Sequence, residues 1–189
     1  MKCAQRVIAL ILLALLFCFS GVSIARAAGE ESNTPTDVIK NIGDVLIYIV
    51  PSAAFGMTLG AKDYEGMKQL TESGVLGMGI VTTLKYTVHS TRPNGNSQSF
   101  PSGHAAITVL SAEFMRKRYG WQYGLPAYVI ATYVSYSRVQ SKQHYIRDVL
   151  TGAAIGFSSS FFITEPNKNW IVQPVVGSSY LGVNLSRSW

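Results

Sequence analysis

The chain has 189 residues, of which 48% are hydrophobic and 14% charged, and its formal net charge is +6. This length corresponds to one domain that is more apolar than an average soluble protein and less apolar than many transporters. Lys2, Arg6 and Arg26 carry three of the positive charges, so removal of residues 1–27 lowers the net charge from +6 to +3. The basic balance therefore does not indicate nucleic-acid binding.

Residues 1–28 have the pattern of a secretory leader or of a first transmembrane helix. Basic residues near the start are followed by an apolar run from Val7 to Phe19, and Ala25-Arg26-Ala27 resembles a cleavage signal. The longer run from Val7 to Ile24, about 18 residues, is also long enough to span a membrane. Both alternatives remain open. The two cysteines lie inside this segment, so no disulfide framework is expected in the remainder.

Residues 29–166 are predicted to form one all-α bundle. It would have about five to six helices when the leader segment, residues 1–28, is counted as one of them. A polar connector, Gly29 to Pro35, comes first. Apolar periodicity then predicts helices over Ile39–Gly60 (kinked at Pro51), Val75–Val88, Ala105–Met115, Trp121–Ser137 and Val149–Ile163. Asp63 and Glu65 fall between the first two helices and indicate a solvated turn rather than an acid/base pair. Gly152 and Gly156 indicate close helix packing.

Residues 167–189 change character and are predicted to form a short hairpin-like tail. Leu181, Val183 and Leu185 alternate with small or polar residues, and Gly177-Ser178 can turn the chain. Two strands cannot close a barrel, so packing against the bundle is the expected role.

Three polar clusters between Lys85 and Asp148 contain the candidate chemistry. In the first, Lys85 and Arg92 are seven residues apart, so a helix that continued to Arg92 would carry both cations on one face. Pro93 disfavours helix at the residue before it, which predicts a helix end near Arg92.

The second cluster, Pro101-Ser102-Gly103-His104, predicts the start of a helix. Ser102 can cap this helix, and Gly103 lets a ligand approach the backbone. The free amides of the first turn, together with the helix dipole, would form an anion-binding site.

In the third cluster, Ser137-Arg138 is followed by His144 and Asp148, which are spaced as i and i+4 on one helix. The carboxylate could then hold one imidazole nitrogen and present the other. Such an imidazole suits a nucleophile or a base, whereas His104, with no acid near it in sequence, suits proton donation to a leaving group.

The order and spacing of these clusters resemble the signature of the type 2 phosphatidic acid phosphatase and vanadium haloperoxidase superfamily. Lys-x6-Arg-Pro, Pro-Ser-Gly-His and Ser-Arg-x5-His-x3-Asp are all complete here. The resemblance implies that His144 forms a phosphohistidine, that Asp148 orients it and that His104 protonates the departing oxygen. It also implies phosphoryl-binding roles for Lys85, Arg92, Ser102, Gly103 and Arg138, with no metal or cofactor.

Three functions fit these residues. The first is an envelope phosphatase that acts on a lipid phosphate or diphosphate, in the inner membrane with its site facing the periplasm. If Arg116-Lys117-Arg118 lies in the cytosol, as the positive-inside rule favours, the three clusters gather at the outer face. The alternatives are a soluble periplasmic acid phosphatase and, third, a vanadate-dependent haloperoxidase. The expected partners are a phosphate ester and a membrane.

Overall fold

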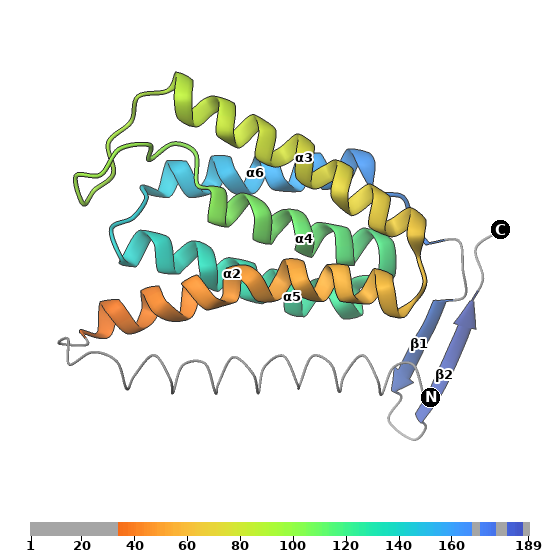
Figure 1. Ribbon diagram of the computed structural model, residues 1–189. Coiled ribbons are helices and arrows are strands. Elements are labelled where there is room, and N and C mark those ends of the chain that lie inside the picture. Colours follow the sequence, from red (N-terminus) through yellow and green to blue (C-terminus); the bar gives the residue numbers. More distant parts are fainter. Residues whose placement is uncertain (1–33, 168–170, 177–180, 187–189) are drawn as a thin grey trace.

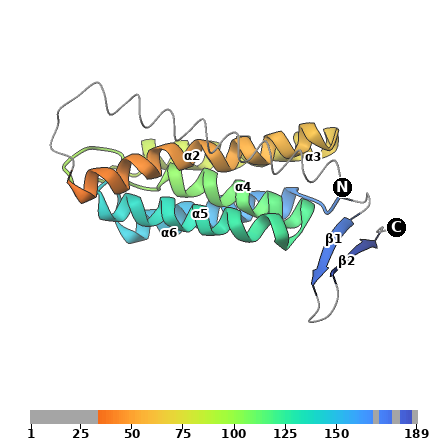
Figure 2. The same ribbon diagram turned by 90° about the horizontal axis from the view of Figure 1, so that it is seen from below.

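The computed structural model describes residues 34–167, 171–176 and 181–186. Within them, five helices form an elongated bundle (Figures 1 and 2). They are α2 (Pro35–Gly60), α3 (Tyr64–Thr87), α4 (Gly103–Tyr119), α5 (Trp121–Gln140) and α6 (Ile146–Ile163). The predicted all-α bundle is therefore confirmed. The proposed leader, residues 1–28, lies outside the described residues.

Helix α2 begins earlier than the apolar periodicity predicted. Thr34 is its N-cap and accepts a hydrogen bond from the Asp37 amide at 3.3 Å, while the Asp37 carboxylate accepts from the Thr34 amide at 3.2 Å. This reciprocal pair is a capping box, and Pro35 occupies the first turn, where its missing amide hydrogen costs nothing. The helix therefore starts at Pro35 and not near Ile39, because capping and not hydrophobicity fixes its first residue.

The prediction of a solvated turn between α2 and α3 is wrong for Asp63. Its side chain is buried, and its Oδ1 caps α3 by accepting from the Gly66 amide at 3.0 Å. Arg118, at the end of α4, donates to the two carboxylate oxygens at 2.5 and 2.8 Å, and Tyr119 donates a third bond. A bidentate buried pair of this kind depends on a partner 55 residues away, which local sequence does not reveal.

Helix α4 lies at the centre of the bundle and contacts the other four described helices. The apolar core between α2, α4 and α5 includes Val50, Ala54, Phe114 and Ala131. On the opposite side, α6 packs so closely on α4 that a Cβ atom at Gly152 would lie 2.2 Å from the Ser102 carbonyl oxygen. The predicted close packing at this glycine is thus confirmed, and it joins α6 to the start of α4.

Helix α3 ends at Thr87, so Arg92 is not on the same helix face as Lys85. Residues 88–102 form a loop that is folded on itself. The Arg92 amide donates to the Asn96 carbonyl at 2.7 Å, and the Ser99 amide donates to the Ser90 carbonyl at 2.9 Å. These loop bonds replace further helix bonds. The expectation of a helix to Arg92 is corrected accordingly.

The tail contains the predicted hairpin. Strand β1 (Ile171–Val176) pairs antiparallel with β2 (Leu181–Ser186), with Ile171 opposite Ser186 and Val176 opposite Leu181. Separately, two of the described helices, α2 and α6, are long and apolar enough to cross a membrane.

Candidate active site

The three sequence clusters meet at one end of the bundle, the left end in Figure 1. Helix α3 ends there, α4 and α6 begin there, and α5 ends there, because these helices alternate in direction. Three helix ends and a connecting loop therefore supply the candidate side chains, which are Lys85, His104, Arg138 and His144. The fold supplies the convergence that sequence spacing alone only suggested.

The start of α4 has the predicted cap. Ser102 is fully buried, and its hydroxyl accepts from the Ala105 amide at 3.4 Å. The Ser102 amide donates to the Asp148 carbonyl at 2.9 Å, which ties this turn to α6. The first amides of α4, including those of Gly103 and His104, have no acceptor within the helix and carry its positive dipole end. The turn can therefore receive an anion.

His144 lies in the loop before α6 and not on it, so the predicted i,i+4 helical pair is not how its ring is held. Its Nδ1 lies 2.7 Å from the Ser99 carbonyl oxygen and 3.8 Å from Asp148 Oδ2. The Ser99 carbonyl therefore accepts the ring hydrogen of His144. The Asp148 carboxylate acts on the ring indirectly, through Ser99. Asp148 Oδ2 accepts from the Ser99 hydroxyl and, at 3.1 Å, from the Tyr145 amide.

This arrangement determines which nitrogen of His144 can react. A carbonyl accepts but never donates, so Nδ1 must carry the hydrogen and Nε2 keeps its lone pair. The imidazole is 3% exposed, and burial, helped by the charges of Arg92 and Lys85, lowers the pKa of His144 to about 4. His144 is therefore neutral at physiological pH, as a nucleophile requires.

His104 lies one residue inside α4, and its Nε2 is 3.6 Å from the Asp44 carboxylate. Burial, followed by the positive charge of Arg138, lowers the pKa of His104 to about 4, and Asp44 opposes this shift. The charges of Arg92 and Lys85 act in the same direction as Arg138. Both histidines thus share one positive environment.

The three predicted cations are each held by a contact within the chain. Lys85 Nζ donates to the Gln98 carbonyl at 2.8 Å, and Arg92 Nη1 donates to Gln143 Oε1 at 3.1 Å. Arg138 is 2% exposed and donates through Nη1 to Asp44 at 2.5 Å. Lys85 and Arg92 act on both histidines, because the charges of both cations lower the pKa of each ring.

Sequence reasoning missed two of the residues at this site. Ser99 holds both His144 and Asp148, but a serine in a polar loop gives no distinguishing signal. Asp44 contacts Arg138 from α2, outside the three clusters. A signal for it existed in the sequence, because Lys40 and Asp44 are opposite charges at i,i+4 spacing, directly before the apolar part of α2.

Comparison with known proteins identifies the family. The family model described as the PAP2 superfamily matches residues 68–170. The chain belongs to the PAP2 superfamily. It is a phosphatase, that is, a phosphoric ester hydrolase.

Similar proteins agree with this membership. The chain is 31% identical over 179 residues to a lipid A 4'-phosphatase of Helicobacter pylori, covering 85% of this chain and 90% of the relative. It is 37% identical over 93 residues to a lipid A 1-phosphatase of Porphyromonas gingivalis, covering 44% of this chain but 21% of that protein.

Two solved structures show the same fold. LpxE of Aquifex aeolicus has a TM-score of 0.54 at 20% identity and covers 69% of this chain and 87% of its own. A transmembrane PAP2 type phosphatidylglycerolphosphate phosphatase of Bacillus subtilis has a TM-score of 0.51 at 23% identity, covering 86% and 94%.

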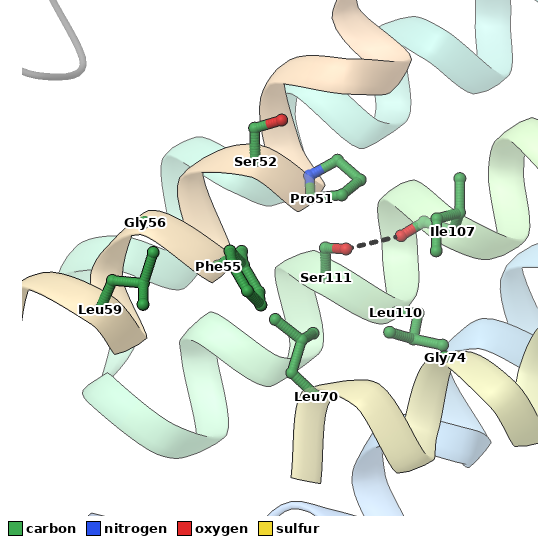
Figure 3. A pocket seen from close by; sticks show the side chains of 10 residues that line it. All are labelled: Pro51, Ser52, Phe55, Gly56, Leu59, Leu70, Gly74, Ile107, Leu110 and Ser111. Atoms are coloured by element: carbon green, nitrogen blue, oxygen red, sulfur yellow. Dashed lines mark hydrogen bonds between the residues drawn. The ribbon is translucent and has the colours of Figure 1, made fainter. Parts of the chain in front are cut away.

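Away from the histidines, this PAP2 protein has an apolar groove between α2, α3 and α4 (Figure 3). It measures about 530 Å³, and Phe55, Leu59, Leu70 and Ile107 are among the side chains that line it. A second pocket of about 450 Å³ borders the loop that carries the site and includes the exposed His89. Neither of these two pockets is lined by His104 or His144.

Proposed function

We propose that this PAP2 phosphatase hydrolyses phosphate monoesters or diphosphates carried by lipids, through a phosphohistidine at His144, on the periplasmic side of the inner membrane. The observation that carries the proposal is the hydrogen bond from His144 Nδ1 to the Ser99 carbonyl at 2.7 Å. It leaves Nε2 unprotonated beside Lys85 and Arg92, whose charges act on this ring.

In the first step, Nε2 of His144 attacks phosphorus while the bond from phosphorus to the ester oxygen breaks. The departing oxygen takes a proton from His104 and leaves as an alcohol from a monoester, or as a lipid phosphate from a diphosphate. A free His104 is neutral near pH 7 because burial, together with the charges of three cations, lowers its pKa to about 4. A bound phosphoryl dianion offsets those cations, so substrate binding itself favours the protonated ring.

In the second step, a water molecule attacks phosphorus, and the bond from phosphorus to His144 breaks. His104, left neutral by the first step, accepts the proton of this water. Inorganic phosphate leaves, and His144 returns to its starting tautomer. Asp148 positions the ring indirectly, through Ser99 and through the Tyr145 amide.

The charge that develops on the phosphoryl oxygens is balanced by Lys85, Arg92 and Arg138. The amides of Gly103 and His104 at the start of α4, with the Ser102 hydroxyl, add donors for the same anion. This set of fixed positive groups supplies the stabilisation that a divalent ion provides in other phosphatases. We therefore propose catalysis without a metal.

A lipid substrate is supported by the names of the relatives, which act on lipid A, and by the apolar exterior. Helices α2 and α6 have the composition of membrane spans, and the groove of Figure 3 is apolar. A site at the end of such helices lies at the level of lipid headgroups. Arg116-Lys117-Arg118 lies at the opposite end of α4, which supports a periplasmic site through the positive-inside rule.

The test is phosphate release from lipid A, phosphatidate, phosphatidylglycerophosphate and undecaprenyl diphosphate in mixed micelles, beside p-nitrophenyl phosphate. We expect release from a lipid substrate and complete loss in His144→Ala. His89→Ala, a change at an exposed histidine, is the matched control and should remain active. Turnover of the aryl phosphate alone would refute a lipid substrate, and normal turnover in His144→Ala would refute the nucleophile.

The intermediate can be trapped by rapid quench with labelled substrate. A phosphohistidine is labile in acid and stable in base, so label should survive alkaline quenching and be lost in acid. The label should be absent from His144→Ala. An acid-stable label would indicate a phosphoserine and contradict the mechanism.

Substrates with different leaving groups test whether His104 acts as the general acid or as a phosphate ligand. His104→Ala should slow phosphorylation by an alkyl phosphate on the order of 10²–10⁴-fold, the usual range for general acid catalysis. Phosphorylation by p-nitrophenyl phosphate should slow far less, because nitrophenolate leaves without a proton. Equal slowing of both would make His104 a phosphate ligand instead.

The proposed orientation is tested by labelling Ser97→Cys, in the exposed loop of the site, in a variant that lacks Cys3 and Cys18. A membrane-impermeant maleimide should label intact spheroplasts. The control is Lys62→Cys, exposed at the opposite end of the bundle, which should react only after lysis. The reverse pattern would place the site in the cytosol.

A further inference from the structure

The Asp44 carboxylate forms an ion pair with Arg138, one of the cations to which the proposed function assigns phosphate binding. Its Oδ1 accepts from Arg138 Nη1 at 2.5 Å and lies 3.6 Å from His104 Nε2. Carboxylates and phosphoryl groups are both oxyanions that pair with the planar guanidinium. Asp44 and the substrate therefore compete for the same group.

The other contacts of Arg138 hold the guanidinium in place independently of Asp44. Nη2 donates to the Lys40 carbonyl at 2.9 Å, and Nε donates to the Ser137 hydroxyl at 3.2 Å. The first of these acceptors belongs to the backbone of α2. The second acceptor, the Ser137 hydroxyl, itself donates to the Val134 carbonyl at 2.7 Å. Of these three contacts, the one with Asp44 is released most simply, by rotation of a side chain.

Asp44 has both the room and a second partner for such a rotation. Its side chain is 37% exposed, whereas that of Arg138 is 3% exposed, so the carboxylate lies on the solvent side of the pair. Its Oδ2 accepts from Lys40 Nζ at 2.9 Å, and Lys40 is likewise 38% exposed. When Arg138 is taken by another anion, Lys40 and water can keep the carboxylate solvated.

The approach of α2 to α5 places Asp44 at this position. A Cβ atom at Gly43 would lie 2.0 Å from Ser137 Oγ and 2.6 Å from Arg138 Nη2. A residue with any side chain would separate the helices here. The glycine therefore lets the backbone of α2 touch the end of α5 and brings the next residue, Asp44, to the guanidinium.

We propose that Asp44 is a positioning residue that holds Arg138 in the substrate-free enzyme and yields it to the phosphoryl group on binding. This inference rests on the proposed function, in which Arg138 binds phosphoryl oxygens. Its consequence is that the carboxylate weakens the affinity of the site for free phosphate. Return of Asp44 to Arg138 then assists release of the product.

The test compares Asp44→Asn with the parent protein in detergent micelles. We expect the dissociation constant of inorganic phosphate, measured by titration calorimetry, to fall about tenfold, the effect of roughly 1.4 kcal/mol. The inhibition constant of orthovanadate and the KM for p-nitrophenyl phosphate should fall with it, while kcat does not rise. Asp44→Glu, which keeps the charge, should bind phosphate as weakly as the parent.

Glu72→Gln is the matched control, because it makes the same change of charge in an exposed i,i+4 ion pair, Lys68–Glu72 of α3. Its phosphate affinity should equal that of the parent. If Asp44→Asn does not fold, as judged by its melting temperature, Asp44→Ser serves for the same comparison. Unchanged or weaker phosphate binding in the folded variant overturns the role of Asp44.

The two proposals fail in different ways. If the parent releases no phosphate from any substrate and does not bind phosphate or vanadate, the proposed function is wrong. If the parent is active and binds phosphate while the folded Asp44→Asn variant shows no tighter binding, only the role of Asp44 is wrong.

Discussion

Substitution of Ser99 by alanine removes one hydroxyl that connects the catalytic loop to α6. The Ser99 hydroxyl donates to Asp148 Oδ2, and both side chains are fully buried. The Ser99 carbonyl, which holds His144, is a backbone group and stays in the variant. The change therefore isolates the link between the loop and the carboxylate.

The size of the effect follows from the burial of Asp148. A hydrogen bond to a charged group contributes about 1.5–3 kcal/mol, and a buried acceptor left without its donor loses that stabilisation. Asp148 Oδ1 accepts no hydrogen bond within the described part of the chain, although Arg147 Nε lies 3.5 Å from it. Ser99 is therefore one of two hydrogen-bond donors to the carboxylate, and the Tyr145 amide is the other. A loss of about 2 kcal/mol corresponds to a melting temperature lower by roughly 4–8 °C for a chain of this size.

Activity should fall in Ser99→Ala, but less than in Asp148→Asn. In Ser99→Ala the carboxylate keeps the Tyr145 amide at 3.1 Å and its charge near His144. In Asp148→Asn the charge itself is lost. The melting temperature in detergent and kcat for p-nitrophenyl phosphate measure the two effects.

Ser97→Ala is the control, since Ser97 is an exposed serine of the same loop. It should match the parent in both measurements. If Ser99→Ala melts and reacts like Ser97→Ala, the Ser99 hydroxyl does not hold the carboxylate and the reasoning is refuted.

Three further predictions follow from the geometry. Gly152→Ala places a Cβ atom 2.2 Å from the Ser102 carbonyl oxygen and should lower the free energy of unfolding by about 1–3 kcal/mol. Gly79→Ala is the control, because open space surrounds Gly79, and it should not destabilise the protein. Equal stabilities of the two variants would contradict the packing. Because His144 has a pKa of about 4 when folded and 6.5 when unfolded, the unfolded state binds more protons between these values. Stability should therefore decline as pH falls from 6.5 to 4, and less so in His144→Asn; identical slopes would contradict the buried neutral ring. Phosphate release should persist in EDTA and be inhibited by vanadate; loss in EDTA that magnesium restores would refute catalysis without a metal.

The sequence by itself determined the helical class and predicted the candidate reacting groups. Apolar runs of helical length predicted the first and last residues of the five described helices to within about four residues, except for the start of α3, which lies at Tyr64 and not at Val75. Ser102 was identified as the α4 cap because capping depends on neighbouring residues only. The histidines and cations followed from residue type and spacing, since phosphoryl chemistry limits which side chains can serve.

Tertiary structure alone decided how those groups are held. Arg92 reaches the site from a folded loop and not from a helix, His144 is held by the Ser99 carbonyl, and Asp44 contacts Arg138 across 94 residues of chain. Each of these contacts joins segments whose proximity depends on the packing of α2, α5 and α6 around α4. Backbone carbonyls and buried ion pairs leave no periodic pattern in a sequence, and they become visible only when the helices are assembled.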